Sequence, residues 1–166
     1  MARCSQRTIT DAAFVHLKGI YSLCIWKCSQ PTITDAAFIH LKGIHDLNMG
    51  DCNQPTITDV AFLYLKGIHT LSMADCSQPT ITDAAFVHLK GIHSLSLWNC
   101  TQLTSAVLTH LKGIKRLNIC HCTQLNLTDD SLKGIEWLNM NDRSEAHVEQ
   151  AKSLGYPVNQ DDTCFP

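Results

Sequence analysis

The chain has 166 residues, of which 45% are hydrophobic and 17% are charged, and its formal net charge is −2. This length allows one globular domain with a hydrophobic core. The slightly negative charge argues against a nucleic-acid-binding protein, which needs a basic face to neutralise phosphates. The sequence has no apolar run of about 18 residues, so we expect no membrane-spanning helix. Its start, MARCSQRTITDAAF, lacks the apolar core of a secretory signal.

A unit of 24 residues recurs along the chain. It is marked by an evenly spaced column of cysteines, namely Cys4, Cys28, Cys52, Cys76 and Cys100, with Cys122 following 22 residues later. The frame I-x-x-L-x-[LMI]-x-x-C leads to each cysteine after the first, as in the stretch from Ile44 to Cys52. The last unit, which begins at Ile135, has Arg143 where the cysteine is expected. We therefore predict an array of about six units in residues 1–142.

Each unit combines two periodicities, as residues 28–51 (CSQPTITDAAFIHLKGIHDLNMGD) show. The alternation in LNM predicts a strand with one buried face. The segment ITDAAFIHLKG predicts a helix of about two turns, with Thr34 as the N-cap, Asp35 in the first turn and Gly43 in the left-handed conformation at the end. A helix this short is not stable alone, so each unit must pack its apolar face against its neighbours.

The two ends of the array differ. Residues 143–166 predict a capping helix and a tail: Ser144 is a suitable N-cap, Gly155 precedes Pro157 at the end, and Val148, Ala151 and Leu154 would face the last unit. At the amino-terminal end the chain opens directly on repeat material. We therefore expect the first strand, near residues 20–27, to be an exposed edge that could pair with another copy.

The repeat resembles the cysteine-containing class of leucine-rich repeats, best known from the substrate-binding arrays of F-box proteins, whose unit reads roughly L-x-x-L-x-L-x-x-C-x-x-[IL]-T-D-x-G-L-x-x-L. The stretch LSLWNCTQLTSAVLTHL matches this frame without gaps, with Ser105 in the place of the acid, whereas earlier units insert two residues before I-T-D. The resemblance covers Cys4 to Asp142. It implies an α/β fold, a right-handed solenoid with a parallel concave sheet and short convex helices. It also implies a partner protein on the concave face and, by analogy, substrate recognition for a ubiquitin ligase.

The cysteine column predicts buried, reduced thiols rather than a metal site or a disulfide framework. No C-x-x-C pair supports zinc binding, and parallel side chains on a sheet are poorly oriented for disulfides. Reduced cysteines predict an intracellular protein, in the cytoplasm or nucleus. Cys24 and Cys120 lie outside the column at outward strand positions, so we expect them to be the most reactive thiols.

A second column, formed by His45, His69 and His93, raises the question of a metal site. Imidazole is a common ligand, but a straight row on a rigid sheet rarely offers tetrahedral geometry, so we predict neither metal nor cofactor. Such a row would become charged below about pH 6.5 and would repel itself.

The outward strand positions vary most between units, so they are the candidate binding residues. Trp26 and Trp98 flank Gly50 and Ala74 in one column, which predicts a shallow trough, because exposed tryptophans are common binding anchors. The alternative is that both indoles lie flat over the margin of the loops. Lys115 and Arg116 would add a basic spot. The predicted site comprises Trp26, His45, Asp46, Asn48, Asp51, His69, Asp75, Trp98, Lys115 and Arg116.

We predict protein–protein recognition on the concave face and no enzymatic activity. Asp51 and Asp75 could form a carboxylate pair, but no nucleophile accompanies them, and the single glycines form no phosphate-binding loop. Neither nucleic acid nor a membrane is an expected partner. The alternative function is a structural or self-assembling repeat scaffold, natural or engineered, that pairs through its amino-terminal edge and has no separate ligand.

Overall fold

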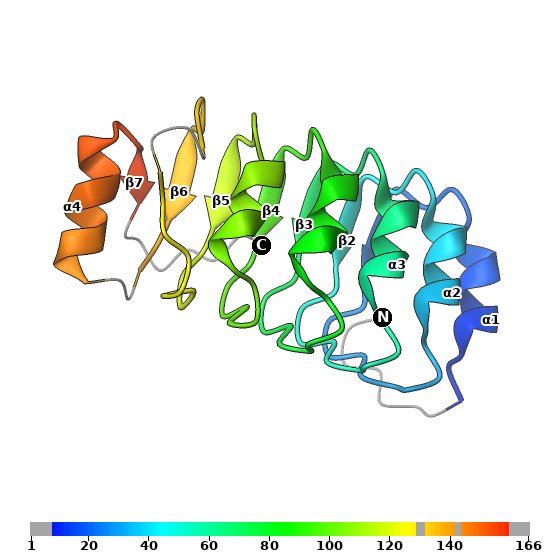
Figure 1. Cartoon of the computed structure of the whole chain (residues 1–166). Coiled ribbons are helices and arrows are strands. Elements are labelled where there is room, and N and C mark those ends of the chain that lie inside the picture. Colours follow the sequence, from blue (N-terminus) through cyan, green and yellow to red (C-terminus); the bar gives the residue numbers. More distant parts are fainter. Residues whose placement is uncertain (1–7, 129–131, 142–143, 160–166) are drawn as a thin grey trace.

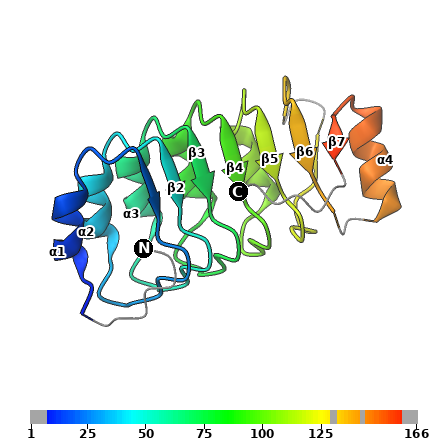
Figure 2. The same ribbon diagram turned by 180° about the vertical axis from the view of Figure 1, so that it is seen from behind.

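The computed structural model describes residues 8–128, 132–141 and 144–159. Its strands form one parallel sheet in chain order (Figures 1 and 2). They are β1 (Ser22–Cys24), β2 (Asp46–Asn48), β3 (Thr70–Ser72), β4 (Ser94–Ser96), β5 (Arg116–Asn118), β6 (Trp137–Asn139) and β7 (Val158–Asn159). The register is one unit per strand, so that Leu23 lies opposite Leu47 and Leu47 opposite Leu71. The predicted parallel-sheet solenoid with short helices is confirmed.

The helices lie on the other side of the sheet (Figure 1). Three units contain one α-helical turn followed by one 3₁₀ turn: α1 (Asp11–Phe14) with η1 (Val15–Leu17), α2 (Asp35–Phe38) with η2 (Ile39–Leu41), and α3 (Asp59–Phe62) with η3 (Leu63–Leu65). The next two units contain the 3₁₀ helices η4 (Asp83–Leu89) and η5 (Ser105–His110). Thr34 caps α2 as predicted, because its hydroxyl accepts a hydrogen bond from the Ala36 N–H. Gly43 has φ +81°, the left-handed conformation expected after this helix.

The core is a set of stacked columns between the sheet and the helices. Phe14, Phe38, Phe62 and Phe86 have no exposed surface, and the Phe62 and Phe86 ring centroids are 5.8 Å apart. The strand leucines and the isoleucines before the helices are also buried. Because each unit contributes only one layer, its apolar surface is removed from water by the layers on either side.

A repeated aspartate–threonine contact joins each helix start to the next unit. Asp35 accepts two hydrogen bonds from Thr58, one from its backbone N–H at 2.7 Å and one from its hydroxyl at 2.8 Å. Asp59 binds Thr82 in the same way, at 2.7 and 2.8 Å. The sequence analysis placed this aspartate in the helix for its dipole alone. The structure shows that it also satisfies a backbone donor at the start of the neighbouring helix.

The carboxy-terminal helix α4 (Glu145–Ser153) lies where the sequence predicts one, with Val148 and Ala151 buried and Leu154 half-buried. The chain then adds the short strand β7 beside β6, which the sequence analysis did not predict. Buried Tyr156 fastens this end to the array, because its hydroxyl donates to the Thr128 carbonyl at 2.7 Å. The predicted tail beyond residue 159 lies outside the described residues. Within the described ranges, no helix combines the length and the apolar character needed to cross a bilayer.

Replacing Asp59 by Ala is expected to lower the free energy of unfolding by about 1–3 kcal/mol, because the Thr82 N–H loses its acceptor. Urea denaturation measures this change. Asp46→Ala is the matched control, since that carboxylate bonds to His45 in its own unit, and it should change stability by less than about 0.5 kcal/mol. Equal losses in the two variants would contradict the proposed role of the inter-unit contact.

Candidate interaction surface

Four aromatic rings form a continuous stack along one margin of the sheet. The ring centroids of Tyr21 and His45 are 4.5 Å apart, and those of the pairs His45–His69 and His69–His93 are both 4.4 Å apart. The interplanar angles are 13°, 17° and 14°. The spacing follows from the separation of neighbouring strands, because equivalent residues repeat at about 4.8 Å. We call these four residues the ring stack. It places a rigid, flat-sided row beside β1 to β4.

The ring stack carries some of the residues of a metal site but not its geometry. His45, Asp46 and His69 offer ligand atoms within 4.8 Å of one another. However, His45 Nδ1 already lies 2.9 Å from Asp46 Oδ1. Zinc–imidazole bonds are about 2.0–2.1 Å long and lie in the ring plane. A metal in the plane of one stacked ring would therefore lie over the edge of the other, so both rings cannot bind one ion without rotating.

An open depression of about 290 Å³ lies on the sheet beside the ring stack. Its lining comes from β1, β2 and β3 and consists of Ser22, Leu23, Cys24, Asp46, Leu47, Asn48, Thr70 and Ser72. Along each strand these positions fall between the ring-stack column and the column that contains Trp26. Most of these side chains are small, the accessible surface of the lining is largely apolar, and Asp46 is its one charged member. The depression therefore combines two predicted site residues, Asp46 and Asn48, with two flanking ones, His45 and His69.

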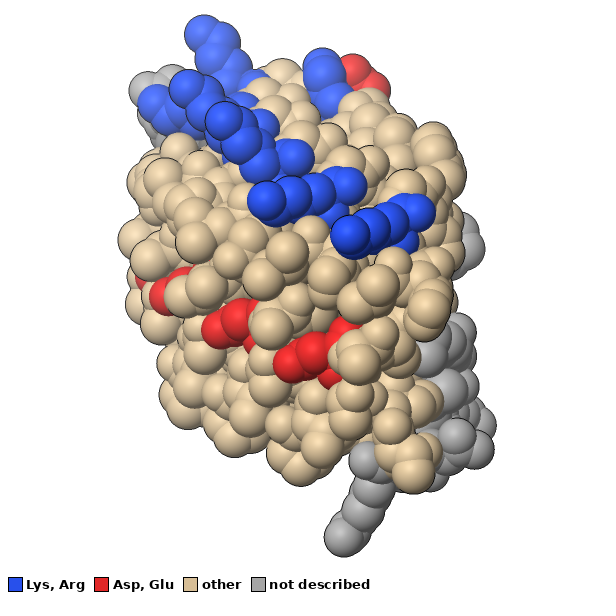
Figure 3. Space-filling view, turned by 90° about the vertical axis from the view of Figure 1, so that its right-hand side faces the viewer, with Lys and Arg blue, Asp and Glu red and all other residues tan. Residues whose placement is uncertain are grey.

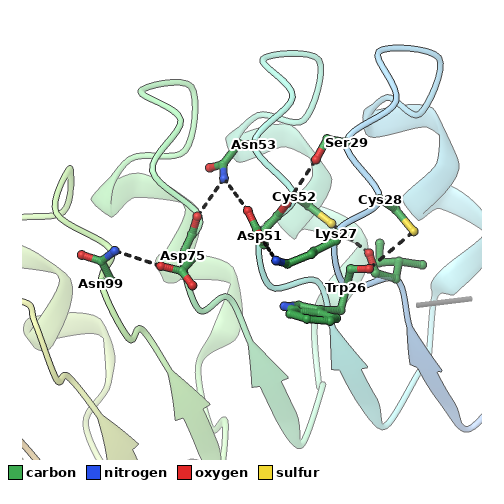
Figure 4. Close-up of polar contacts among 10 residues, drawn as sticks. Trp26, Lys27, Cys28, Ser29, Asp51, Cys52, Asn53, Asp75 and Asn99 are labelled. Atoms are coloured by element: carbon green, nitrogen blue, oxygen red, sulfur yellow. Dashed lines mark hydrogen bonds and ion pairs between the residues drawn. The ribbon is translucent and has the colours of Figure 1, made fainter. Parts of the chain in front are cut away.

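The two tryptophans do not border an open trough in the way the sequence predicted. Gly50 is buried, and a Cβ added to it would lie 3.0 Å from Trp26 Cδ1, so this indole covers the glycine. Lys27 follows Trp26 in the same turn, and its ammonium lies 4.7 Å from the Trp26 ring centroid (Figure 4). Trp98 packs edge-on against His121, with the centroids 4.9 Å apart. Trp26 therefore matches the alternative in which the indole covers the loop margin.

Asp51 and Asp75 lie in the turns that follow β2 and β3, where they have a structural role. Their φ angles are 58° and 60°, and their backbone N–H groups donate to the carbonyls of Ala74 and Trp98 in the next units. Aspartate and asparagine tolerate this left-handed conformation better than most residues. The carboxylates also bind neighbours: Asp51 Oδ2 lies 3.2 Å from Lys27 Nζ, and Asp75 accepts from Asn99 (Figure 4). The turn preference could have been predicted from the Asp and Asn residues after β2, β3 and β4, although Lys27 and His121 occupy the equivalent position after β1 and β5.

Asn48 has a comparable local function. Its side-chain oxygen accepts a hydrogen bond from the Gly50 N–H at 3.0 Å, which holds the chain where it leaves β2. Asn118 binds the Cys120 N–H at the same distance. The amide group of Asn48 still borders the depression, so this residue both shapes and lines it.

One of the two residues of the predicted basic spot, Lys115, is paired with an acidic side chain. Lys115 Nζ lies 2.9 Å from a Glu136 carboxylate oxygen, and this hydrogen bond and charge lower the pKa of Glu136. The Arg116 guanidinium lies 5.3 Å from the Trp137 ring centroid. Glu136 and Trp137 occupy outward positions of the next strand, and their contacts with the two basic side chains follow from the register between β5 and β6. Lys115 and Arg116 lie over β5, away from the depression over β1 to β3.

The column cysteines are structural. The Cys52, Cys76, Cys100 and Cys122 thiols are buried, and each donates to a backbone carbonyl of the preceding unit. The acceptors are the carbonyls of Ile25, Met49, Met73 and Leu97, at 3.0, 3.2, 3.1 and 2.9 Å. Burial raises the pKa of Cys76 to about 12 and also raises the pKa values of Cys52 and Cys100 well above the ordinary thiol range. The expectation for Cys120 is wrong: this thiol is buried and lies 2.8 Å from Asn139 Oδ1. Cys24 remains partly exposed.

The comparisons with known proteins extend the description of the fold. No protein-family model matches the sequence, and no curated protein does. Among solved structures, the chain is similar to a chain in the crystal structure of the Rad7 and Elc1 complex in yeast, with a TM-score of 0.62 and 16% sequence identity. The similarity covers 97% of this chain and 44% of that chain, so the protein spans less than half the length of this neighbour. At this identity the likeness shows a shared fold.

The ring stack makes stability depend on pH. The pKa of His69 is lowered from its ordinary value of 6.5, first by partial desolvation and then by the charges of His93 and His45, while Asp46 opposes the shift. The unfolded chain therefore binds more protons than the folded chain just below pH 6.5, and stability must fall as the pH decreases through this value.

We expect the free energy of unfolding to fall as the pH decreases from about 7.5 to about 5.5. The His69→Gln substitution should make this dependence on pH less steep. Urea denaturation at several pH values measures the slope. His16→Gln, which removes an exposed histidine on the helix side, is the control. An unchanged slope in His69→Gln would show that the stack does not oppose protonation.

Proposed function

We propose that the sheet face over β1 to β3 binds another protein, which inserts an apolar side chain with a neighbouring lysine or arginine into the depression. The observation that carries this proposal is the depression itself, whose lining positions fall along each strand between the ring-stack column and the column that contains Trp26. Rigid aromatic side chains contribute contact area at a low cost in conformational entropy, which is why they dominate binding hot spots.

The charges around the depression favour a basic group on the partner. Asp46 belongs to the lining, and its side chain is 34% exposed. His45 Nδ1 lies 2.9 Å from one Asp46 carboxylate oxygen, and Lys27 is paired with Asp51, so no lysine or arginine ion pair with Asp46 is recorded among the described residues. A lysine or arginine placed here would gain a charge-assisted hydrogen bond.

The shape of the depression favours a protein over a metabolite. Small-molecule sites are concave and enclose most of their ligand. This depression is open and spans three neighbouring strands, so it fits a side chain carried by a larger surface. The structural neighbour, a chain from a two-protein complex, is consistent with this class of function.

The proposal assigns binding to the repeat array, residues 1–142, and treats residues 143–166 as its carboxy-terminal cap. The resemblance to F-box repeat arrays extends it one step further, to recognition of a ubiquitin-ligase substrate. Recovery of ligase subunits with the captured partner would support that extension.

Affinity capture from source cells tests the proposal, with the bound proteins identified by mass spectrometry. A partner held by the wild type should be lost, or bound at least about tenfold more weakly, in the Trp26→Ala and Asp46→Ala variants. Trp137→Ala is the matched control, because this tryptophan lies on the same sheet over β6. Trp98→Ala reports whether the site extends to β4.

Capture of the same proteins by all four variants would overturn the proposed site. Loss of the partner in Trp137→Ala alone would place the site at the carboxy-terminal end of the sheet instead.

A further inference from the structure

Three parallel rows cross the helix side of the molecule. The first consists of the aspartates that open the helices, Asp11, Asp35, Asp59 and Asp83. The second consists of exposed aliphatic side chains: Val15, Ile39, Leu63 and Val87 are 43%, 42%, 48% and 51% exposed. The third consists of the lysines that follow the helices, Lys18, Lys42, Lys66 and Lys90. Figure 3 shows a basic row and an acidic row on one face, separated by uncharged surface.

The spacing within each unit explains why the rows are parallel. The aspartate and the aliphatic residue are four positions apart, so they share one helix face, and the lysine follows three positions later at the helix end. The units stack in register, so each position becomes a row. We call these residues the striped face.

The charges of the striped face remain available to a partner. The ion pairs of lysines recorded in the described part of the chain involve Lys27, Lys115 and Lys152, none of which belongs to this face. Lys42 lies 5.3 Å from the Tyr64 ring centroid. Each aspartate accepts two hydrogen bonds from a threonine, but a carboxylate has about four lone-pair sites, and all four are partly exposed.

The helix dipole explains the sign of the charges at each helix end. It does not explain the aliphatic row between them. A contiguous row of exposed aliphatic side chains rimmed by polar groups is typical of a protein interface.

The striped face is complementary to itself in one orientation. A two-fold axis that lies between two such faces and runs parallel to the rows places each aspartate row opposite a lysine row, and the aliphatic rows opposite each other. A two-fold axis across the rows would instead place lysine opposite lysine. Symmetric dimers use the same surface on both subunits. A second copy of this chain therefore presents the charge pattern that complements the striped face.

The rows end at different points, which sets the extent of the contact. The fifth unit has Ser105 in place of the aspartate and Thr109 in place of the aliphatic residue, whereas the lysines continue at Lys112 and Lys133. Complementarity is therefore confined to the helices α1, α2, α3 and η4. An extended polyanion or an anionic membrane would use the lysines but would be repelled by the aspartates.

We propose that the striped face is the contact surface of a parallel, symmetric dimer of this chain. The dimer leaves both sheet faces uncovered, so it would present two copies of the proposed binding site and increase avidity for a repetitive partner. This inference concerns a different face from the proposed function, and either can fail without the other.

Sedimentation over a concentration series tests the dimer. The wild type should change from monomer to dimer mass as concentration rises, and more readily at low salt. Lys18→Glu with Lys66→Glu should weaken dimerisation at least about tenfold, because each change places like charges opposite each other in both copies. Lys112→Glu with Lys133→Glu is the matched control: it changes net charge equally, but these lysines have no aspartate opposite them.

Several outcomes would overturn the proposal. They are a monomer at every concentration, a dimer that neither pair of substitutions weakens, or equal weakening by both pairs. Energy transfer between donor and acceptor dyes on the two amino termini checks the orientation. Efficient transfer in the dimer is expected, and transfer that occurs only between an amino and a carboxy terminus would contradict the parallel arrangement.

Discussion

No unit of this chain can bury its own apolar face, and this constraint governs the rest of the structure. The first five units each supply a three-residue strand and about two helical turns, which are too short to be stable alone. Neighbouring units complete the core through the phenylalanine column and join their backbones through the parallel ladder. The aspartate–threonine contacts repeat the same connection at the helix starts. Stability therefore depends on an unbroken register between units, as in other solenoids.

The same register builds the surfaces. Equivalent residues of neighbouring units lie one strand apart. A residue type that recurs at the same position of successive units therefore forms a row on the surface. Tyr21 and three histidines become a ring stack, and one aspartate, one aliphatic residue and one lysine per unit become the striped face. Substitutions at a few outward positions then interrupt the rows. The small side chains of Ser22, Asn48 and Ser72 leave the depression between the ring stack and Trp26. The sheet side varies from unit to unit, whereas the first four units of the helix side are nearly uniform.

The period and the residue types were sufficient to predict the parallel strands, the short capped helices, the buried cysteines and the outward columns. Contacts between units were harder to predict, because they depend on where a side chain points. Asp35 was assigned to the helix dipole, but it binds Thr58 of the next unit. The sequence suggested Asp51 and Asp75 as a possible carboxylate pair and as binding residues, but both occupy left-handed turns. The trough required both tryptophans to stand upright, whereas Gly50 leaves space that the Trp26 ring fills. Strand β7 has only two residues, too few for a periodic pattern.

The central functional claim is that a partner protein occupies the sheet face over β1 to β3. Hydroxyl-radical footprinting of the side chains, with and without the captured partner, tests it most directly. The claim predicts that Tyr21, Trp26, His45 and His69 become less reactive in the complex, while Leu63 and His88 on the helix side keep their reactivity. Protection confined to the helix side, or unchanged reactivity of these four residues in a complex that has formed, would contradict it.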